Sequence, residues 1–455
     1  MRRTLLLATL TLGLVSIALG GDAAGAQQAL DVRLLDARAR QQTLDLIRQE
    51  KFDLILPGAM RDNGIDMWIH WIRMGNPDPL EQDLGAEFGV FIFTDRGGAR
   101  IERAVLQPFH LLDRQAYDIV GDLEDLRAHV HERDPQRIGI NSSAWLGVAD
   151  GMSYNDYQQL VETIGPLYAE RLVSAEQLIT DFRVRRVRLE LAAFSMAGEM
   201  TRRTLERVLS NEVITPGMTT SSDAAWWVQD RLLEMGVRSS FGISMPRISR
   251  SATADPEASR RPDYVIGRGD FLTYDMGIRY LNFGTDFKRH AYVLRAEESA
   301  PPADLQHAWD QGHRAREIIR ANIKVGRTAA ETLAILAQAL EAENYVYTPF
   351  VNDGRDRDIV AALGDDPRTG ISIDCHMVGN TGNSQAAVGP AIAPFRQTKA
   401  HLVIQPTHLF SLEFVVHSLM DDGTRLAINF EDNAVVTDNG VEWPYPPNSR
   451  ILLIR

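Results

Sequence analysis

The stretch Asp270–Leu294, DFLTYDMGIRYLNFGTDFKRHAYVL, decides how the rest of the chain is interpreted. Apolar and aromatic residues run on both sides of a short polar centre flanked by two glycines, a pattern typical of a β-hairpin. A turn centred between residues 280 and 281 would place Asp275 opposite Asp286, with their Cβ atoms about 4.5–5.5 Å apart. Because two carboxylates at that distance repel each other, a divalent metal ion is the simplest compensation. Two solvated carboxylates on an exposed face are the alternative.

Length, composition and charge describe an ordinary globular protein. The 455 residues are enough for two or three domains, and 44% hydrophobic and 24% charged residues are typical of such domains. The net charge of −13 and the lack of a basic tract argue against a nucleic-acid binder. Since Cys375 is the only cysteine, no intrachain disulfide is expected.

The N-terminus has the pattern of a signal peptide. Two arginines precede the apolar run Leu5–Leu19, which is short for a membrane span. Small residues then lead to a cleavage site before Gln27. We therefore expect residues 1–26 to be removed and the protein to be exported to the periplasm or the extracellular space, without a stable membrane anchor.

Residues 27–172 alternate helical and strand patterns and predict a small α/β domain. The expected helices are Leu35–Glu50, Asp66–Met74 and Tyr154–Ile164, and the expected strands are Phe52–Leu56, Val90–Phe93, Ile101–Leu106 and Ile138–Asn141. Trp68, His70 and Trp71 could line a pocket. At helical spacing, however, aromatic residues more often belong to a core.

Residues 173–455 form a second predicted domain, which opens with a long helical pattern up to about residue 210. Within it, Ile214–Gly217 (ITPG) and Ile323–Gly326 (IKVG) open two similar units, 109 residues apart, and each leads into a helix. Thr328 and Glu331 have the spacing of a capping box. Two copies of a helix-plus-hairpin unit predict pseudo-twofold symmetry, and the acidic hairpin lies between the two openings.

Three later segments each place one polar residue among strand-forming residues: His376, Glu413 and Glu431. A buried acid is costly unless it is paired or bound to metal, although each acid alone would more often be an edge-strand charge. With Asp275 and Asp286 they give the order Asp, Asp, His, Glu, Glu. Such an ordered set argues against five unrelated surface charges.

This order and the local patterns around it resemble the pita-bread metallopeptidases, the family of aminopeptidase P, prolidase, methionine aminopeptidase and creatinase. The matching patterns are Asp275-Met-Gly, Thr285-Asp286-Phe-Lys-Arg289, His376-x-x-Gly379 and Phe430-Glu431-Asp-x-x-Val435-Val-Thr437. The resemblance covers about residues 173–455. It implies an α/β (α+β) protein, with a creatinase-like N-terminal domain followed by a C-terminal pita-bread domain of pseudo-twofold symmetry.

By this resemblance, five residues hold two divalent metal ions such as Mn, Co or Zn: Asp275, Asp286, His376, Glu413 and Glu431. Asp275 would serve one ion, His376 and Glu413 the other, and Asp286 and Glu431 would bridge them. The implied reaction is attack of water on the scissile amide of a short peptide or small amide, with Glu413 carrying the proton to the leaving amine. The resemblance also implies a homodimer.

Several positions depart from the family's pattern around the substrate. Histidines are expected within residues 250–262, at Ser372 and at Asn383, and none is present there. The arginine that commonly stands two residues before the last glutamate is replaced by Asn429. Asn383 could donate a hydrogen bond to an oxyanion, and His417 could replace a lost acid or base. Both are therefore candidate catalytic residues.

Two residues near the predicted ligands are expected to be structural. His290 shares a face with Asp286 but lies four residues further along the strand. Cys375 adjoins His376, and the same alternation points its thiol away from the site.

The sequence predicts an exported, dinuclear metal-dependent peptidase of the Xaa-Pro aminopeptidase or dipeptidase type. Two alternatives stay open. A family member that has lost peptidase chemistry would bind a peptide or small metabolite without turnover. A creatinase-like C–N hydrolase that acts without metal agrees less well with the sequence, because that branch lacks several metal ligands that this chain keeps.

Overall fold

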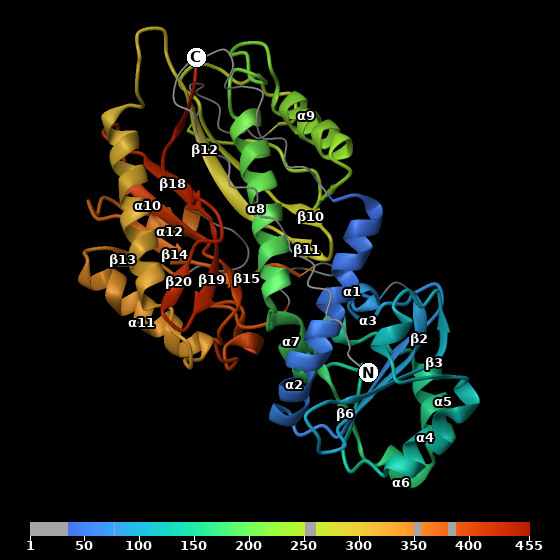
Figure 1. Cartoon of the computed structure of the whole chain (residues 1–455). Coiled ribbons are helices and arrows are strands. Elements are labelled where there is room, and N and C mark those ends of the chain that lie inside the picture. Colours follow the sequence, from blue (N-terminus) through green and yellow to red (C-terminus); the bar gives the residue numbers. More distant parts are fainter. Residues whose placement is uncertain (1–34, 77, 251–260, 350–355, 381–387) are drawn as a thin grey trace, which may run out of the picture. The chain divides into compact units, whose positions relative to one another are not determined.

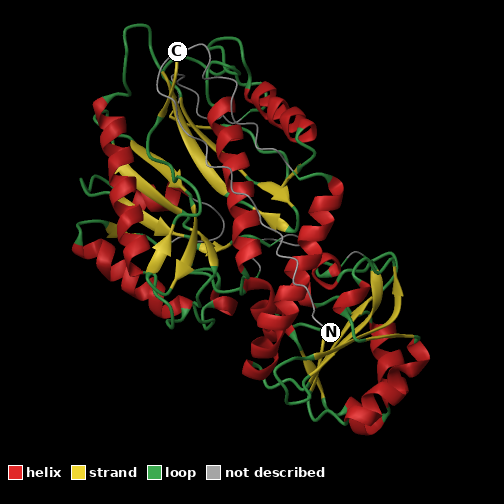
Figure 2. Cartoon of the chain, in the orientation of Figure 1, coloured by secondary structure: helices red, strands yellow, loops and turns green. Residues whose placement is uncertain are grey.

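Helices and strands alternate along the chain in a mixed α/β fold (Figures 1 and 2). The computed structural model describes residues 35–76, 78–250, 261–349, 356–380 and 388–455. Asp36–Arg455 cluster as one compact unit, so a boundary between residues 172 and 173 stays a prediction. The expected signal peptide lies outside the described residues. Within them, no helix has both the length and the apolar character needed to cross a membrane.

A six-stranded mixed sheet, ordered β4-β3-β2-β1-β5-β6, forms the first part of the described chain. Its strands are β1 (Met67–Ile72), β2 (Phe88–Thr94), β3 (Glu102–Phe109), β4 (Ile119–Gly121), β5 (Ile138–Ile140) and β6 (Leu172–Ser174). The helices are α1 (Ala37–Leu54), α2 (Leu56–Asp62), α3 (Glu81–Leu84), α4 (Leu126–Arg133), α5 (Tyr154–Ile164) and α6 (Pro166–Ala169). The predicted helices Leu35–Glu50 and Tyr154–Ile164 are confirmed, as are the last three predicted strands.

Two predictions in this part are wrong. The segment predicted as the helix Asp66–Met74 is strand β1. All six β1 residues are buried, and the five apolar ones belong to two core clusters on opposite faces of the strand. The sequence therefore lacks the polar alternation that marks a half-exposed strand. The predicted strand Phe52–Leu56 is the end of α1 and the start of α2. Pro57 is favoured in the first turn of a helix, where its missing N–H costs nothing.

Trp68, His70 and Trp71 belong to the core, as expected. The two tryptophans lie in different core clusters, on opposite faces of β1. His70 is fully buried, and its Nε2 lies 3.2 Å from Asp78 Oδ2.

The second part of the described chain contains four small sheets, ordered β11-β10-β7, β21-β12-β9-β8, β13-β14-β17-β18 and β15-β16-β19-β20. Its helices are α7 (Glu176–Val184), α8 (Arg188–Val208), α9 (Ser221–Glu234), α10 (Ala303–Asn322), α11 (Ala329–Ala342) and α12 (Asp356–Leu363). The strands before the second repeat are β7 (Arg238–Ser239), β8 (Arg247–Arg250), β9 (Phe271–Met276), β10 (Ile278–Tyr280), β11 (Phe283–Gly284) and β12 (Phe287–Val293). The later strands are β13 (Val346–Tyr347), β14 (Gly370–Ile373), β15 (His376–Met377), β16 (Leu409–Ser411), β17 (Phe414–Leu419), β18 (Arg425–Phe430), β19 (Asn433–Thr437), β20 (Gly440–Glu442) and β21 (Leu452–Ile454).

The internal repeat is present in the backbone hydrogen bonds. Gly217 and Gly326 both adopt positive φ, at 80° and 87°, and their N–H groups donate to Ile266 O and Ile404 O. Each glycine leads into a helix of 14 residues, α9 or α11, and a capping box opens both helices. The openings of the two units and the helices that follow them are therefore equivalent, as the sequence predicts.

A glycine in each long helix allows close packing against an aromatic ring. A Cβ at Gly312 of α10 would lie 2.0 Å from the Phe430 ring, and one at Gly198 of α8 would lie 2.1 Å from the Tyr445 ring. In Figure 1, α10 lies beside β18, the strand that leads into Glu431, and α10 also contacts β17. The position of Glu431 thus depends on this helix–sheet contact.

Candidate metal centre

The predicted acidic hairpin is present, but its turn is centred one residue later in the chain than the sequence predicts. Strands β9 and β12 pair antiparallel so that Asp275 faces Lys288, and Asp286 is its diagonal neighbour. The loop consists of Leu281 and Asn282, because Leu281 adopts a positive φ of 53°. The predicted direct pairing of the two aspartates is therefore wrong. Asp275 and Asp286 still lie on the same face of the sheet. The residue opposite Asp275 is Lys288 and not Asp286, and these two are separated by two residues, which is one full period of a strand.

The other three predicted ligands come from segments that meet the hairpin. His376 begins β15, Glu413 lies between β16 and β17, and Glu431 directly follows β18. The Lys288 N–H donates to Glu431 O at 3.1 Å, which joins β12 to the segment after β18. The Asp374 N–H donates to Glu413 O at 3.0 Å, which joins the other two segments. Four separate stretches of chain thus converge at one place.

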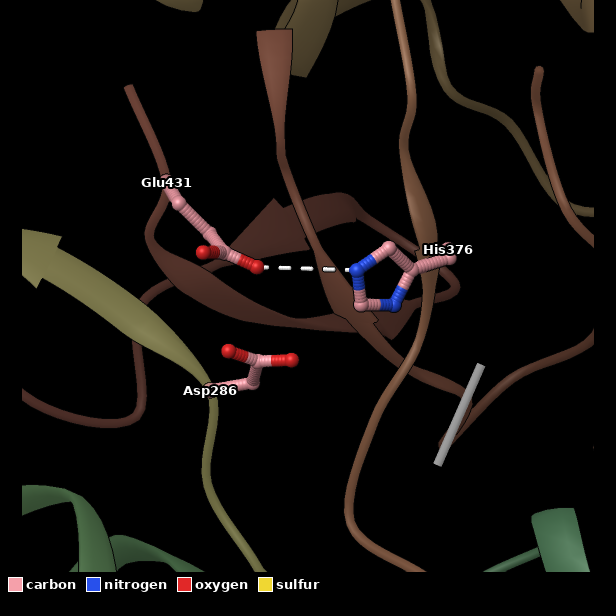
Figure 3. Close-up of side chains that lie close together, drawn as sticks. All are labelled: Asp286, His376 and Glu431. Atoms are coloured by element: carbon pink, nitrogen blue, oxygen red, sulfur yellow. Dashed lines mark ion pairs between the residues drawn. The ribbon is translucent and has the colours of Figure 1, made fainter. Parts of the chain in front are cut away.

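Three of the five predicted ligands form a compact set. One ligand atom each of Asp286, His376 and Glu431 lies within 4.8 Å of the other two (Figure 3). The His376 imidazole approaches Glu413 as well, with 3.4 Å between Nε2 and Glu413 Oε2 and 3.5 Å between Nε2 and Glu431 Oε1. Oxygen ligands with one imidazole suit a first-row divalent ion.

The orientation of His376 agrees with metal binding. Its Nδ1 lies 2.9 Å from Met377 O, so Nδ1–H donates to that carbonyl and Nε2 faces the carboxylates. Burial would lower the pKa of His376, but the hydrogen bonds to Glu413 and Glu431 raise it well above its usual range. The position around Nε2 therefore favours a cation, whether a proton or a metal ion.

Neighbouring polar residues fix the ligands. The Ser411 hydroxyl lies 2.6 Å from Glu431 Oε1. The Asn433 side-chain amide donates to Asp286 O at 2.5 Å and accepts from the Asp286 N–H at 3.3 Å. The Asn429 amide donates to Glu413 Oε1 at 2.9 Å. These contacts hold the carboxylates in place through groups other than a bound ion.

Lys288 is the residue that the sequence reasoning missed. Its ammonium lies 2.9 Å from Glu413 Oε1 and 3.2 Å from Asp275 Oδ2, and it also pairs with Glu431 Oε2. A signal was present in the sequence, because alternation along the strand puts Lys288 on the same face as Asp286. A buried lysine needs a carboxylate partner, and in the structure its partners are three of the predicted ligands.

The carboxylates differ in their affinity for protons. Burial raises the pKa of Asp275 to about 6, with Glu431 and Glu413 adding to the rise and Lys288 opposing it. Burial, together with the charges of Glu431 and Asp275, raises the pKa of Asp286 well above its usual range. Burial would lower the pKa of Lys288, but the carboxylates, Asp275 first, raise it well above its usual range. The ammonium therefore keeps its charge at neutral pH.

The remaining predicted site residues have different outcomes. Asn383 lies outside the described residues. His417 is buried in β17, where it pairs with Gly370 and Ala427, and its catalytic role stays a prediction. His290 is structural as expected, because its ring nitrogens contact Asn429 O at 3.0 Å and the Asn448 amide at 2.9 Å.

The thiol of Cys375 is buried, also as expected, and its Sγ donates to Glu413 O at 3.4 Å. Ser372, at a position where the family's pattern has a histidine, hydrogen-bonds the Thr348 hydroxyl at 2.9 Å.

Comparison with solved structures shows the fold. The X-Pro aminopeptidase of Thermotoga maritima MSB8 aligns with a TM-score of 0.60 and 16% identity, over 87% of this chain and 99% of that chain. The Xaa-Pro dipeptidase from Bacillus anthracis aligns with a TM-score of 0.57 and 17% identity, over 90% of this chain and 99% of that chain. The prolidase from Pyrococcus horikoshii OT3 aligns with a TM-score of 0.54 and 17% identity, over 89% of this chain and 99% of that chain. No curated protein matches the sequence.

The sequence itself matches one protein family. The profile of metallopeptidase family M24 matches residues 192–438, which is more than half of the chain. The match includes all five predicted ligands, the acidic hairpin and both repeat openings. The chain therefore belongs to metallopeptidase family M24, and its fold is the pita-bread fold.

Proposed function

We propose that this protein is a metal-dependent hydrolase that cleaves a short peptide or small amide, of the Xaa-Pro aminopeptidase or dipeptidase type. The observation that carries the proposal is the convergence of Asp286, His376 and Glu431 within 4.8 Å, with the His376 Nε2 facing the carboxylates. The M24 family consists of metallopeptidases. The three solved structures above are an X-Pro aminopeptidase, an Xaa-Pro dipeptidase and a prolidase, which supports the substrate class.

Each residue of the centre has a definable role. Asp286, His376 and Glu431 would hold a divalent ion. When bound, such an ion polarises a scissile carbonyl and makes water more acidic. Burial would raise the pKa of Glu413, but the Lys288 ammonium and the hydrogen bond from His376 lower it below its usual range. An ionised Glu413 can accept a proton and deliver it to the leaving amine.

The contacts of Lys288 favour a second candidate, a protein that binds a peptide or small metabolite without turnover. The Lys288 ammonium pairs with three of the predicted ligands, so part of the carboxylate charge expected to hold metal is already compensated. The substrate-facing histidine expected at Ser372 is also missing, and Ser372 is 1% exposed. Peptide binding by the metal-loaded protein without any hydrolysis would favour this candidate.

A hydrolysis assay separates the two candidates. The purified protein is incubated with Xaa-Pro dipeptides and tripeptides, with Mn²⁺, Co²⁺ or Zn²⁺ added, and released amino acids are measured. We expect turnover that stops with a chelator and in Asp286→Ala. Asp366→Ala removes a surface aspartate paired with Arg368 and should leave turnover unchanged. Hydrolysis that persists unchanged in Asp286→Ala would refute the assigned centre.

We further propose that the protein is exported after loss of residues 1–26 and that it forms a homodimer. N-terminal sequencing of protein from the periplasm or the culture medium should begin at Gln27. Light scattering during gel filtration should give twice the mass of one chain. A cytoplasmic protein that begins at Met1 would contradict export, and a single-chain mass would contradict dimerisation.

A further inference from the structure

Lys288 is built into the centre by the register of the hairpin. It pairs directly with Asp275 across β9 and β12, and its side chain is 7% exposed. Its neighbours on β12 are also buried, so the side chain has no open path to solvent along the strand. The three N–H donors of an ammonium face three acceptors, the carboxylates of Asp275, Glu413 and Glu431. Lys288 thus has no donor left for a substrate, and its role concerns the carboxylates.

The ammonium lies at one of the two ion positions that the family resemblance implies. That position would use Asp275 together with the bridging residues Asp286 and Glu431, and Lys288 pairs with two of these three. The compact set described above contains Asp286, His376 and Glu431 but not Asp275. Lys288 alone contacts Asp275 and Glu413, and the compact set alone contains Asp286 and His376. Glu431 belongs to both, with Oε2 toward Lys288 and Oε1 toward His376.

The Lys288 ammonium opposes a second ion by its charge. With all four carboxylates ionised, one ammonium and one divalent ion leave a net charge of −1 at the centre. A second divalent ion would change this net charge to +1. It would also lie against the ammonium on the same Asp275 and Glu431 oxygens, and like charges at such a distance in a buried site repel strongly.

We propose that the Lys288 ammonium replaces one of the two metal ions, so that the centre binds a single divalent ion at Asp286, His376 and Glu431. The inference rests on the proposed function only in assuming that the centre binds metal, not that it turns over a peptide. The reaction chemistry of the centre then differs from a two-metal mechanism, because Lys288 supplies fixed positive charge without a position for water or substrate.

Counting bound ions tests the proposal. The purified protein is equilibrated with excess Mn²⁺, freed of unbound ion, and analysed for manganese per chain. We expect one ion per chain in the wild type and a doubling in Lys288→Ala, which removes both the charge and the side chain that fill the second position. Lys51→Ala is the matched control, since Lys51 is also buried and pairs with Glu190 at 3.2 Å. Its ion count should equal that of the wild type.

Each outcome decides the question. Two ions in the wild type would overturn the proposal, as would one ion in a folded Lys288→Ala, because another feature would then exclude the second ion. No ion in the wild type would overturn it together with the proposed function. One ion without peptide turnover would leave this inference standing and refute the hydrolase. If Lys288→Ala does not fold, the Mn²⁺ spectrum of the wild type decides, since electron paramagnetic resonance distinguishes an isolated ion from a coupled pair.

Discussion

Replacing Lys288 with methionine should destabilise the protein when metal is withheld and should make metal more stabilising. Methionine keeps most of the stem volume, so the change mainly removes the charge. Removing one partner of a buried ion pair costs about 3–5 kcal/mol, because the other charge stays buried without compensation. Glu431 is 1% exposed and Glu413 17%, so both fall under this estimate. The Asp275 side chain is 38% exposed, so only the pairs with Glu431 and Glu413 are counted in this estimate.

The measurement is urea unfolding of both proteins, once with a chelator and once with saturating Mn²⁺. With chelator, Lys288→Met should unfold with a free energy lower by about 3–5 kcal/mol than that of the wild type. Saturation at one hundred times Kd stabilises by about 2.7 kcal/mol for each site, so a variant with two sites should gain about twice as much as the wild type. The difference in the free energy of unfolding between the wild type and Lys288→Met should therefore be smaller with Mn²⁺ than with chelator.

Two results would refute this reasoning. One is equal stability of variant and wild type in chelator, which would mean that the ammonium does not compensate the carboxylates. The other is an equal gain from Mn²⁺ in both proteins. Lys51→Met serves as the control, because Lys51 is a second buried lysine and its partner Glu190 lies far along the sequence from the predicted ligands. Glu190 keeps the Arg186 guanidinium at 3.0 Å, so the loss of stability should be smaller than in Lys288→Met. The loss in Lys51→Met should not be recovered with Mn²⁺.

Three further changes test other parts of the structure. His376→Ala removes the imidazole of the compact set, so Mn²⁺ binding measured by calorimetry should weaken at least about tenfold, and unchanged affinity would place the ion elsewhere. Gly312→Ala puts a Cβ 2.0 Å from the Phe430 ring, so thermal unfolding should show a loss of about 1–3 kcal/mol, and an unchanged midpoint would contradict the close packing. Burial lowers the pKa of His290 to about 3, below the value of about 6.5 in the unfolded chain. As pH falls below about 6.5, the unfolded chain binds a proton that the folded protein does not. The free energy of unfolding therefore decreases by about 1.4 kcal/mol per pH unit. The stability difference between wild type and His290→Gln should therefore shrink by about 2 kcal/mol between pH 7.5 and 5, and a difference independent of pH would contradict the buried neutral imidazole.

The sequence was a good guide to the C-terminal fold because its signals are local. The openings at Gly217 and Gly326 need a positive φ and then a capped helix, and both requirements are visible in neighbouring residues. Strand β1 was missed for the opposite reason. A strand buried on both faces has no polar alternation, and only its pairing with β2 and β5 distinguishes it from a buried helix.

The candidate site was predictable in its members but not in its arrangement. The order of acids and histidine identified the residues that converge, whereas the register of the hairpin depends on the backbone of one loop residue, Leu281. Moving the turn by one residue exchanges Asp286 for Lys288 as the partner of Asp275. The importance of Lys288 therefore depended on a register that residue types alone did not determine.

Lys288 and Asn429 contact the same carboxylate oxygen of Glu413. In the family's pattern an arginine stands two residues before the last glutamate, and in this chain the neutral Asn429 donates to Glu413 Oε1 at 2.9 Å. The same oxygen accepts from the Lys288 ammonium at 2.9 Å. A guanidinium at residue 429 would add a second fixed positive charge beside this one, at the carboxylate that we expect to handle protons. The Asn429 hydrogen bond adds to the lowering of the pKa of Glu413, but the neutral amide brings no second charge to this carboxylate. Lys288 and Asn429 therefore act on the same group, and the effects of Lys288→Met and Asn429→Arg should not be additive.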